Sequence, residues 1–85
     1  MTDRQQVVED ITTRLYEVIS DAKQDDLTEQ RDLRDFAGFD SLGILETLVW
    51  LETTFSVMIP DEELIVDHFD CVAKMADYVM AHRAA

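Results

Sequence analysis

The sequence contains few of the residues that break or cross-link a chain. Its 85 residues include two glycines, one proline and one cysteine. So little glycine and proline argues against disorder and against a turn-rich all-β fold. The single cysteine, Cys71, excludes an internal disulfide framework and a metal site built from several cysteines. We expect Cys71 to be a small packed residue, with a reactive thiol as the alternative.

Basic residues are also scarce, and none occurs between residues 36 and 73. The formal net charge is −12, from 19 acidic and 7 basic side chains. Nucleic-acid binding depends on Lys and Arg contacts with phosphates, so this composition argues against it. An acidic surface favours solubility and also suits partners that present basic patches. We expect one half of the fold to carry an almost purely negative surface.

No apolar run is long enough to span a membrane, and the N-terminal residues lack the apolar core of a signal peptide. Hydrophobic residues make up 47% of the chain, which is enough for one core. We therefore expect a single domain, 1–85, in the cytoplasm, without contact with a membrane.

Hydrophobic residues recur at helical spacing in three segments. Thr2 and Gln5 fit a capping box that opens a first helix, which should end at about residue 22. A second helix, about 41–54, is apolar on nearly all sides, which indicates a central position or apolar surface kept for a partner. A last helix follows a cap at Asp70.

The segments between these helices differ in character. Residues 23–39 are polar, with Leu27, Leu33 and Phe36 as spaced apolar plugs, which predicts a long ordered loop. Pro60 and the acids after it favour a short helix that reaches residue 67 or 69. The sequence therefore predicts an all-α four-helix bundle with three longer helices, one short helix and a long first loop.

Ser41 stands at the start of the second helix. Its hydroxyl should point outward beside free N–H groups, which together with the helix dipole favour an anion. Ser41 could simply cap the helix, but Asp40 can also serve as the cap and leave the hydroxyl free. Gly43 has no side chain, which would leave the space beside Ser41 open, either for function or as a tolerated glycine. We expect Ser41 to be a point of attachment.

Catalysis and metal binding find little support in the sequence. A serine hydrolase needs a histidine and a third group near the serine. His68 and His82 are present, but no Gly-x-Ser-x-Gly elbow is. The acids of residues 61–70 lack the alternating spacing and the glycine of a calcium loop. We therefore predict no catalytic residue and no dedicated metal site.

Two blocks of the sequence and several residues around them carry a family likeness. They are Gly38-Phe39-Asp40-Ser41-Leu42, Glu46, Leu51-Glu52, Phe55, Ile59-Pro60-Asp61-Glu62-Glu63 and Met75-Ala76-Asp77-Tyr78-Val79. Together they closely resemble the acyl carrier protein family. The resemblance covers about the last fifty residues closely, and the first helix by length and pattern only.

The resemblance implies a carrier that performs no chemistry itself. Members carry 4′-phosphopantetheine on the motif serine, here Ser41, which Asp40 and Leu42 flank. A phosphopantetheinyl transferase moves this group from coenzyme A, and its thiol then holds acyl or aminoacyl cargo as a thioester. Implied partners are a loading enzyme and synthase or transferase enzymes with basic docking patches, which the chain meets as a monomer. The implied partner-binding residues are Leu45, Glu46, Val49, Glu52, Glu62, Glu63 and Asp67.

Three residues depart from the fatty-acid type of this family, and the segment 64–69 is slightly longer and more apolar than in that type. Gly43 and Thr53 stand where such carriers often have acids, and Trp50 is unusual in this helix. Trp50 is either a core residue or a partner contact. These departures favour a specialised polyketide or nonribosomal-peptide pathway. The alternatives are a carrier for general fatty-acid synthesis and an acidic helical adaptor without a prosthetic group.

Overall fold

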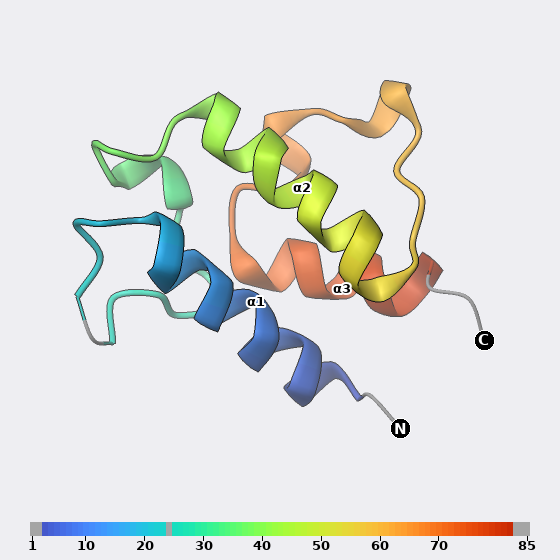
Figure 1. Cartoon of the computed structure of the whole chain (residues 1–85), viewed down its shortest axis with the longest axis horizontal. Helices are drawn as coiled ribbons and strands as arrows, with labels where there is room; N and C mark the ends of the chain where they lie inside the picture. The colour runs from blue at the N-terminus through green and yellow to red at the C-terminus, as the bar shows by residue number, and fades with distance from the viewer. Residues whose placement is uncertain (1–2, 24, 83–85) are drawn as a thin grey trace.

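The computed structural model describes residues 3–23 and 25–82, and these residues form helices and loops without a strand (Figure 1). The α-helices are α1 (Arg4–Val18), α2 (Ser41–Phe55) and α3 (Val72–His82). Three short 3-10 helices lie between them: η1 (Leu33–Asp35), η2 (Asp61–Glu63) and η3 (Val66–His68). The predicted all-α fold and its three longer helices are confirmed.

Each α-helix turns an apolar face toward one shared core. The buried residues of α1 are spaced four apart, as expected for one face of a helix, and α1 packs mainly on α3. Burial of each large apolar side chain stabilises the fold by roughly 1.5–3 kcal/mol. The fully buried helical residues are Val7, Ile11, Leu15, Ile44, Leu48, Leu51, Val72, Met75, Ala76 and Val79.

The first helix begins and ends at residues other than those we expected. Thr2 lies outside the described residues, and the N-cap of α1 is Asp3, whose carboxylate accepts the Gln6 N–H at 2.9 Å. The helix ends at Val18 rather than at residue 22, because Ile19 adopts an extended backbone. In this position the Ile19 side chain is 1% exposed, so leaving the helix places it in the core.

In its described residues, the long loop between α1 and α2 packs on the core, as predicted. Its three expected plugs are all buried: Leu27, Leu33 and Phe36. The Leu33 N–H donates to the Asp70 carbonyl at 2.8 Å, and the Ala73 N–H donates to the Glu29 carbonyl at 2.9 Å. These long-range bonds fasten the loop to the start of α3 and fix the position from which α2 begins.

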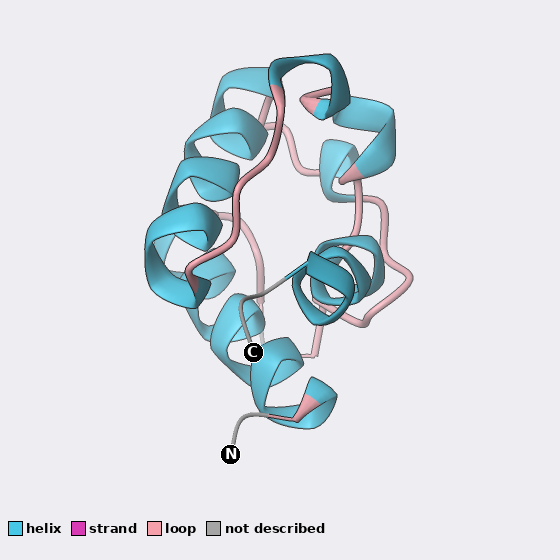
Figure 2. Cartoon of the chain, turned by 90° about the vertical axis from the view of Figure 1, so that its right-hand side faces the viewer, coloured by secondary structure: helices cyan, strands magenta, loops and turns pink. Residues whose placement is uncertain are grey.

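The short fourth helix predicted between residues 60 and 69 is not confirmed. This segment forms two separate turns, η2 and η3, instead of one continuous helix (Figure 2). Ile65 divides them with an extended backbone, φ −115° and ψ 124°. Ile65 and Val66 are both β-branched and lose rotamer freedom in a helix, which disfavours an α-helix through this point.

Candidate functional site

Ser41 is the first residue of α2, and it is exposed. Asp40 supplies the cap of the helix: its carboxylate accepts the Gly43 N–H at 3.1 Å, and its carbonyl accepts the Ile44 N–H at 3.1 Å. Within the described residues, no hydrogen bond engages the Ser41 hydroxyl. The cap is therefore made without this hydroxyl, as the sequence suggested.

The backbone at this helix start suits a negatively charged group. Asp40 occupies the N–H groups of Gly43 and Ile44, whereas those of Ser41 and Leu42 have no partner in the described part of the chain. Free N–H groups and the positive end of the helix dipole favour an anion at this point. A phosphate ester on this exposed serine would therefore lie beside free N–H donors.

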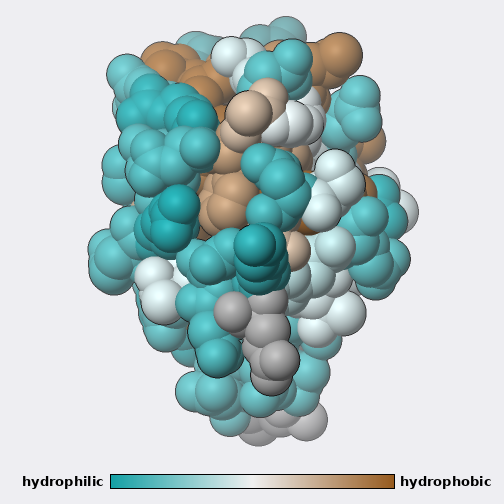
Figure 3. Space-filling model, turned by 90° about the vertical axis from the view of Figure 1, so that its left-hand side faces the viewer, coloured by the Kyte–Doolittle hydropathy of each residue, from teal (hydrophilic) through white to brown (hydrophobic). Residues whose placement is uncertain are grey.

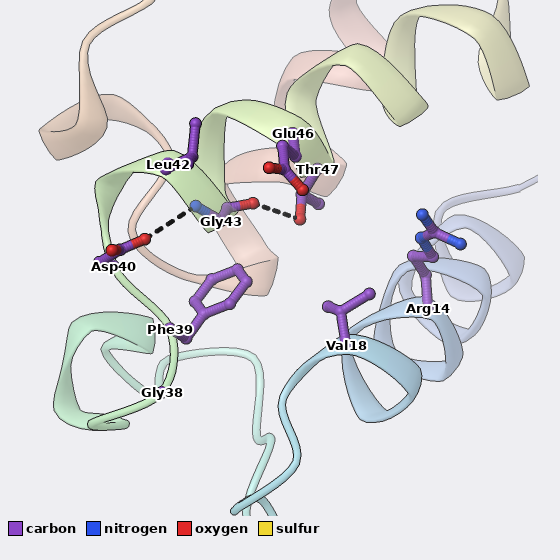
Figure 4. Close-up of a pocket in the computed structure, with 9 residues that line it drawn as sticks. All are labelled: Arg14, Val18, Gly38, Phe39, Asp40, Leu42, Gly43, Glu46 and Thr47. Atoms are coloured by element: carbon purple, nitrogen blue, oxygen red, sulfur yellow. Dashed lines mark hydrogen bonds between the residues drawn. The ribbon is translucent and has the colours of Figure 1, made fainter.

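A hollow of about 210 Å³ lies beside Ser41, between the end of α1 and the first turns of α2 (Figure 4). The residues on either side of Ser41, Asp40 and Leu42, both line it. The remaining lining residues are Arg14, Val18, Gly38, Phe39, Gly43, Glu46 and Thr47. Sequence reasoning assigned no role to Arg14, because only the fold brings α1 to this place.

We expected the space beside Ser41 to be open at Gly43, and this is wrong on the side of Gly43 that faces Phe39. The buried ring of Phe39 lies directly against Gly43. The lack of a side chain at Gly43 is therefore used for close packing of the loop on α2. The open space is the hollow toward α1.

Three exposed residues lie along one face of α2 after Ser41: the motif residue Leu42 and the predicted partner-binding residues Glu46 and Val49. Leu42 and Val49 are 62% and 61% exposed, and Glu46 is exposed between them. Residues at this spacing share one face of a helix. Leu45, also predicted, is half-buried and packs on the core. Figure 3 shows the left-hand side of the view in Figure 1, and hydrophobic surface is concentrated in its upper part. In Figure 1, α2 begins at the same height.

The predicted partner-binding acids differ in what they do inside the protein. Glu52 is half-buried and accepts the Ile59 N–H at 2.9 Å. Glu63 accepts the hydroxyl of Tyr78 at 2.9 Å. Burial, first, and this hydrogen bond, second, raise the pKa of Tyr78. Both acids thus join the 56–63 region to the helices, while Glu62 is exposed.

Asp67, another predicted partner-binding acid, belongs to an ion-pair cluster that sequence reasoning did not identify. Arg34 binds it at 2.7 Å and also binds Asp32 and Asp70, each at 3.1 Å. Hydrogen bonds from Arg34 lower the pKa of Asp32, and a hydrogen bond to Asp70 raises the pKa of Lys74. The cluster joins η1, η3 and the start of α3, so it fixes the loop that precedes α2.

Trp50, His68 and His82 form no hydrogen bond with Ser41 among the described residues. Trp50 is half-buried, with its ring edge-on to Phe55 at 5.8 Å and the Arg14 guanidinium 5.8 Å from its centroid. The His82 ring stacks on Tyr78 at 3.9 Å, and His68 is exposed in η3. Neither histidine is hydrogen-bonded to Ser41 among the described residues. Cys71 is buried, as predicted.

The described residues contain neither a candidate metal site nor a helix that could span a membrane. No cluster of three or more His, Cys, Asp or Glu side chains in residues 3–23 and 25–82 has the arrangement to hold a metal ion. No helix in these ranges has the length and hydropathy of a bilayer span. The exposed Ser41 at the first position of a helix that Asp40 caps, in a small all-α fold, fits the class of carrier proteins that the sequence resembles.

Comparisons with known proteins agree with that class. Residues 8–79 match the family described as phosphopantetheine attachment site. The acyl carrier protein of Rubrobacter xylanophilus is 30% identical over 80 residues, which cover 91% of this chain and 96% of that protein. The acyl carrier protein of Clostridium perfringens is 32% identical over 72 residues, covering 81% and 92%. A crystal structure of a mitochondrial acyl carrier protein of Toxoplasma superposes with a TM-score of 0.77, at 26% identity, covering 98% of this chain and 93% of that chain.

The chain belongs to the acyl carrier protein family. It is a non-catalytic carrier, and its cofactor is phosphopantetheine.

Proposed function

We propose that Ser41 is the residue to which 4′-phosphopantetheine is attached. The observation that carries this proposal is the exposed Ser41 hydroxyl at the start of α2, beside a cap made entirely by Asp40. Because Asp40 satisfies the helix end, Ser41 can be modified without loss of the cap. The unpartnered N–H groups of Ser41 and Leu42 would stabilise the phosphodiester.

The transfer replaces one phosphate bond by another. The Ser41 oxygen bonds to the phosphorus that carries the pantetheine arm of coenzyme A, and adenosine 3′,5′-bisphosphate leaves. A base or solvent on the transferase takes the hydroxyl proton. The attached arm supplies a thiol that holds cargo as a thioester. This chain contributes an accessible oxygen, a favourable helix end and a surface that partner enzymes recognise.

We propose that partner enzymes dock on the outer face of α2 defined by Leu42, Glu46 and Val49. Two exposed apolar side chains on either side of a carboxylate suit a partner with an apolar pocket and a basic rim. Glu62 is exposed in η2, the 3-10 helix that follows α2, and would extend the negative charge. Expected partners are a phosphopantetheinyl transferase, a loading enzyme and synthase or transferase enzymes.

The pathway we favour is a specialised one, of polyketide or nonribosomal-peptide type. This preference rests on Gly43 and Thr53, which stand where fatty-acid carriers often have acids, and on Trp50, a bulky residue that is unusual in this helix. A role in general fatty-acid synthesis is the alternative. The monomeric state, the cytoplasmic location and the extent of a single domain over 1–85 stay predictions. Mass analysis of the cargo on protein isolated from its source would separate the two pathways.

The experiment on attachment is intact-mass spectrometry after incubation with coenzyme A and a broad-specificity transferase. We expect the wild type to gain the mass of one phosphopantetheine group and Ser41→Ala to gain nothing. Ser20→Ala is the matched control, because Ser20 is also exposed but lies in a turn after α1. It should gain the same mass as the wild type. An equal gain on Ser41→Ala would refute the attachment.

A further inference from the structure

Arg14 is a cation without a carboxylate partner, among the described residues, in the middle of an acidic protein. The other arginines of the described residues, Arg4, Arg31 and Arg34, each form at least one ion pair. The Nε atoms of Arg14 and Arg31 are both buried and have no hydrogen-bond partner among these residues, but Arg31 Nε lies 3.3 Å from the Asp35 carboxylate, whereas Arg14 has no ion pair there. A buried N–H group left without an acceptor costs free energy. Arg14 lines the hollow, so an acceptor that enters the hollow would satisfy this atom once the side chain turns toward it.

The lining of the hollow restricts what that group can be. Asp40 and Glu46 line it together with Arg14, and two carboxylates disfavour a further anion there. Val18, Leu42 and Phe39 add apolar surface. A neutral carbonyl oxygen on an apolar chain satisfies the Arg14 donor, avoids the carboxylates and contacts the apolar walls.

The position of the hollow identifies the chain that supplies this carbonyl. Both neighbours of Ser41 in sequence, Asp40 and Leu42, form part of its wall (Figure 4). Phosphopantetheine has a dimethyl-bearing carbon chain followed by two amides, and its first amide carbonyl lies a few bonds from the phosphate. An arm on Ser41 therefore brings both an apolar segment and a carbonyl to the mouth of the hollow.

We propose that the first, amide-bearing part of the arm docks reversibly in the hollow between α1 and α2, with the Arg14 Nε–H donating to an amide carbonyl. This inference rests on the attachment proposed at Ser41. Arg14 is then a positioning residue, which holds the arm against the carrier between visits to enzymes. The affected surroundings include the ring of Trp50, the only tryptophan of the chain, because the Arg14 guanidinium lies 5.8 Å from it.

The test compares the side-chain Nε–H resonances of arginine in the unmodified and the phosphopantetheine-bearing protein by NMR. We expect the Arg14 Nε–H resonance to shift on attachment, together with backbone resonances of Val18 and Thr47 and the fluorescence of Trp50. Arg4 serves as the internal reference, because its Nε already donates to Asp77 and it begins α1, about 15 Å from Arg14 along the helix. An unmoved Arg14 resonance in fully modified protein would overturn the docking.

Variants and cargo distinguish docking of the arm from a local effect of the phosphate and from docking of the acyl group. Arg14→Met should abolish the shifts at Val18 and Thr47, whereas Arg31→Met, the matched loss of a half-buried arginine in the loop, should retain them. Retained shifts in Arg14→Met would refute the role of Arg14. Shifts that appear only after an acyl group is loaded would assign the hollow to the cargo and refute docking of the arm. Intact mass is recorded for each sample, so a protein that gains no arm contradicts the attachment, and only a modified protein tests the docking.

Discussion

The ring of Phe39 lies against the backbone of Gly43, four residues further along the chain. A Cβ atom placed on Gly43 would come within 2.8 Å of the Phe39 Cδ1 atom. Phe39 is 4% exposed, so its ring has little room to move away. This contact fixes the end of the long loop on the first turn of α2, immediately beside Ser41.

We predict that Gly43→Ala destabilises the protein. Alanine favours a helix over glycine by about 1 kcal/mol, but overpacking in a tight contact costs roughly 1–3 kcal/mol, so the clash wins. The net loss should be about 1 kcal/mol in the free energy of unfolding, measured by urea denaturation. Gly38→Ala is the control, because its added Cβ meets only the Asp21 carboxylate at 3.4 Å. Equal stability of wild type and Gly43→Ala would contradict the packing described.

A second prediction is that Asp40 stabilises the start of α2 and that Ser41 does not. Asp40→Ala removes the carboxylate that caps α2 and should lower the free energy of unfolding by about 1 kcal/mol. Ser41→Ala should leave it unchanged, because the cap does not use the Ser41 hydroxyl. Thermal and urea unfolding of both variants provide the measurement. A large loss in Ser41→Ala would instead indicate that the serine has a structural role.

The residues that sequence reasoning placed correctly are those whose partners lie close in the chain. Asp40 accepts the N–H of Gly43, three residues further on, and the core faces of the α-helices follow from their period of apolar residues. The plugs of the long loop could be predicted because a large apolar side chain in a polar segment must find a core. The exposed place of Ser41 follows from the same local signals.

The features that were missed depend on contacts between distant parts of the chain. The hydrogen bond that the Ile59 N–H donates to the Glu52 carboxylate forms only once the chain turns back after α2. The ion pairs of Arg34 join residues more than thirty positions away, on η3 and at the start of α3. Periodicity reports which side of a helix is apolar, but it does not report which acid meets which donor. For the same reason, the sequence did not predict that Arg14 lines a hollow with the first residues of α2.

The third prediction separates two acids that the sequence grouped together. Glu46 is exposed, whereas the Glu52 carboxylate accepts a backbone N–H, so we expect the two Glu→Lys variants to fail differently. Glu46→Lys should slow loading by partner enzymes, mostly at low salt, because rim charges act mainly on the association rate. Its free energy of unfolding should change by less than about 0.5 kcal/mol.

Glu52→Lys should instead lower the free energy of unfolding by about 1–3 kcal/mol, since it leaves the Ile59 N–H without its acceptor. Loading rates as a function of salt and urea unfolding curves, both measured on each variant, distinguish the two effects. Glu52→Gln is the control, because an amide oxygen can still accept the N–H. A Glu46→Lys variant that loads at the wild-type rate at low ionic strength would argue against the docking face on α2.

The last prediction concerns alkaline pH and the contact between Tyr78 and Glu63. Burial and the hydrogen bond to Glu63 raise the pKa of Tyr78 above its ordinary value of 10.0 in the folded state, while the unfolded chain retains about that value. The folded state therefore holds the phenolic proton more tightly, and its advantage is complete below pH 10. As the pH rises beyond 10, the unfolded state loses this proton first, so the stability contributed by Tyr78 declines until the folded pKa is passed. Tyr78→Phe cannot titrate, so we expect the stability difference between wild type and this variant to shrink between pH 9 and 11 in urea unfolding, whereas a constant difference would show that the proton of Tyr78 is not coupled to folding.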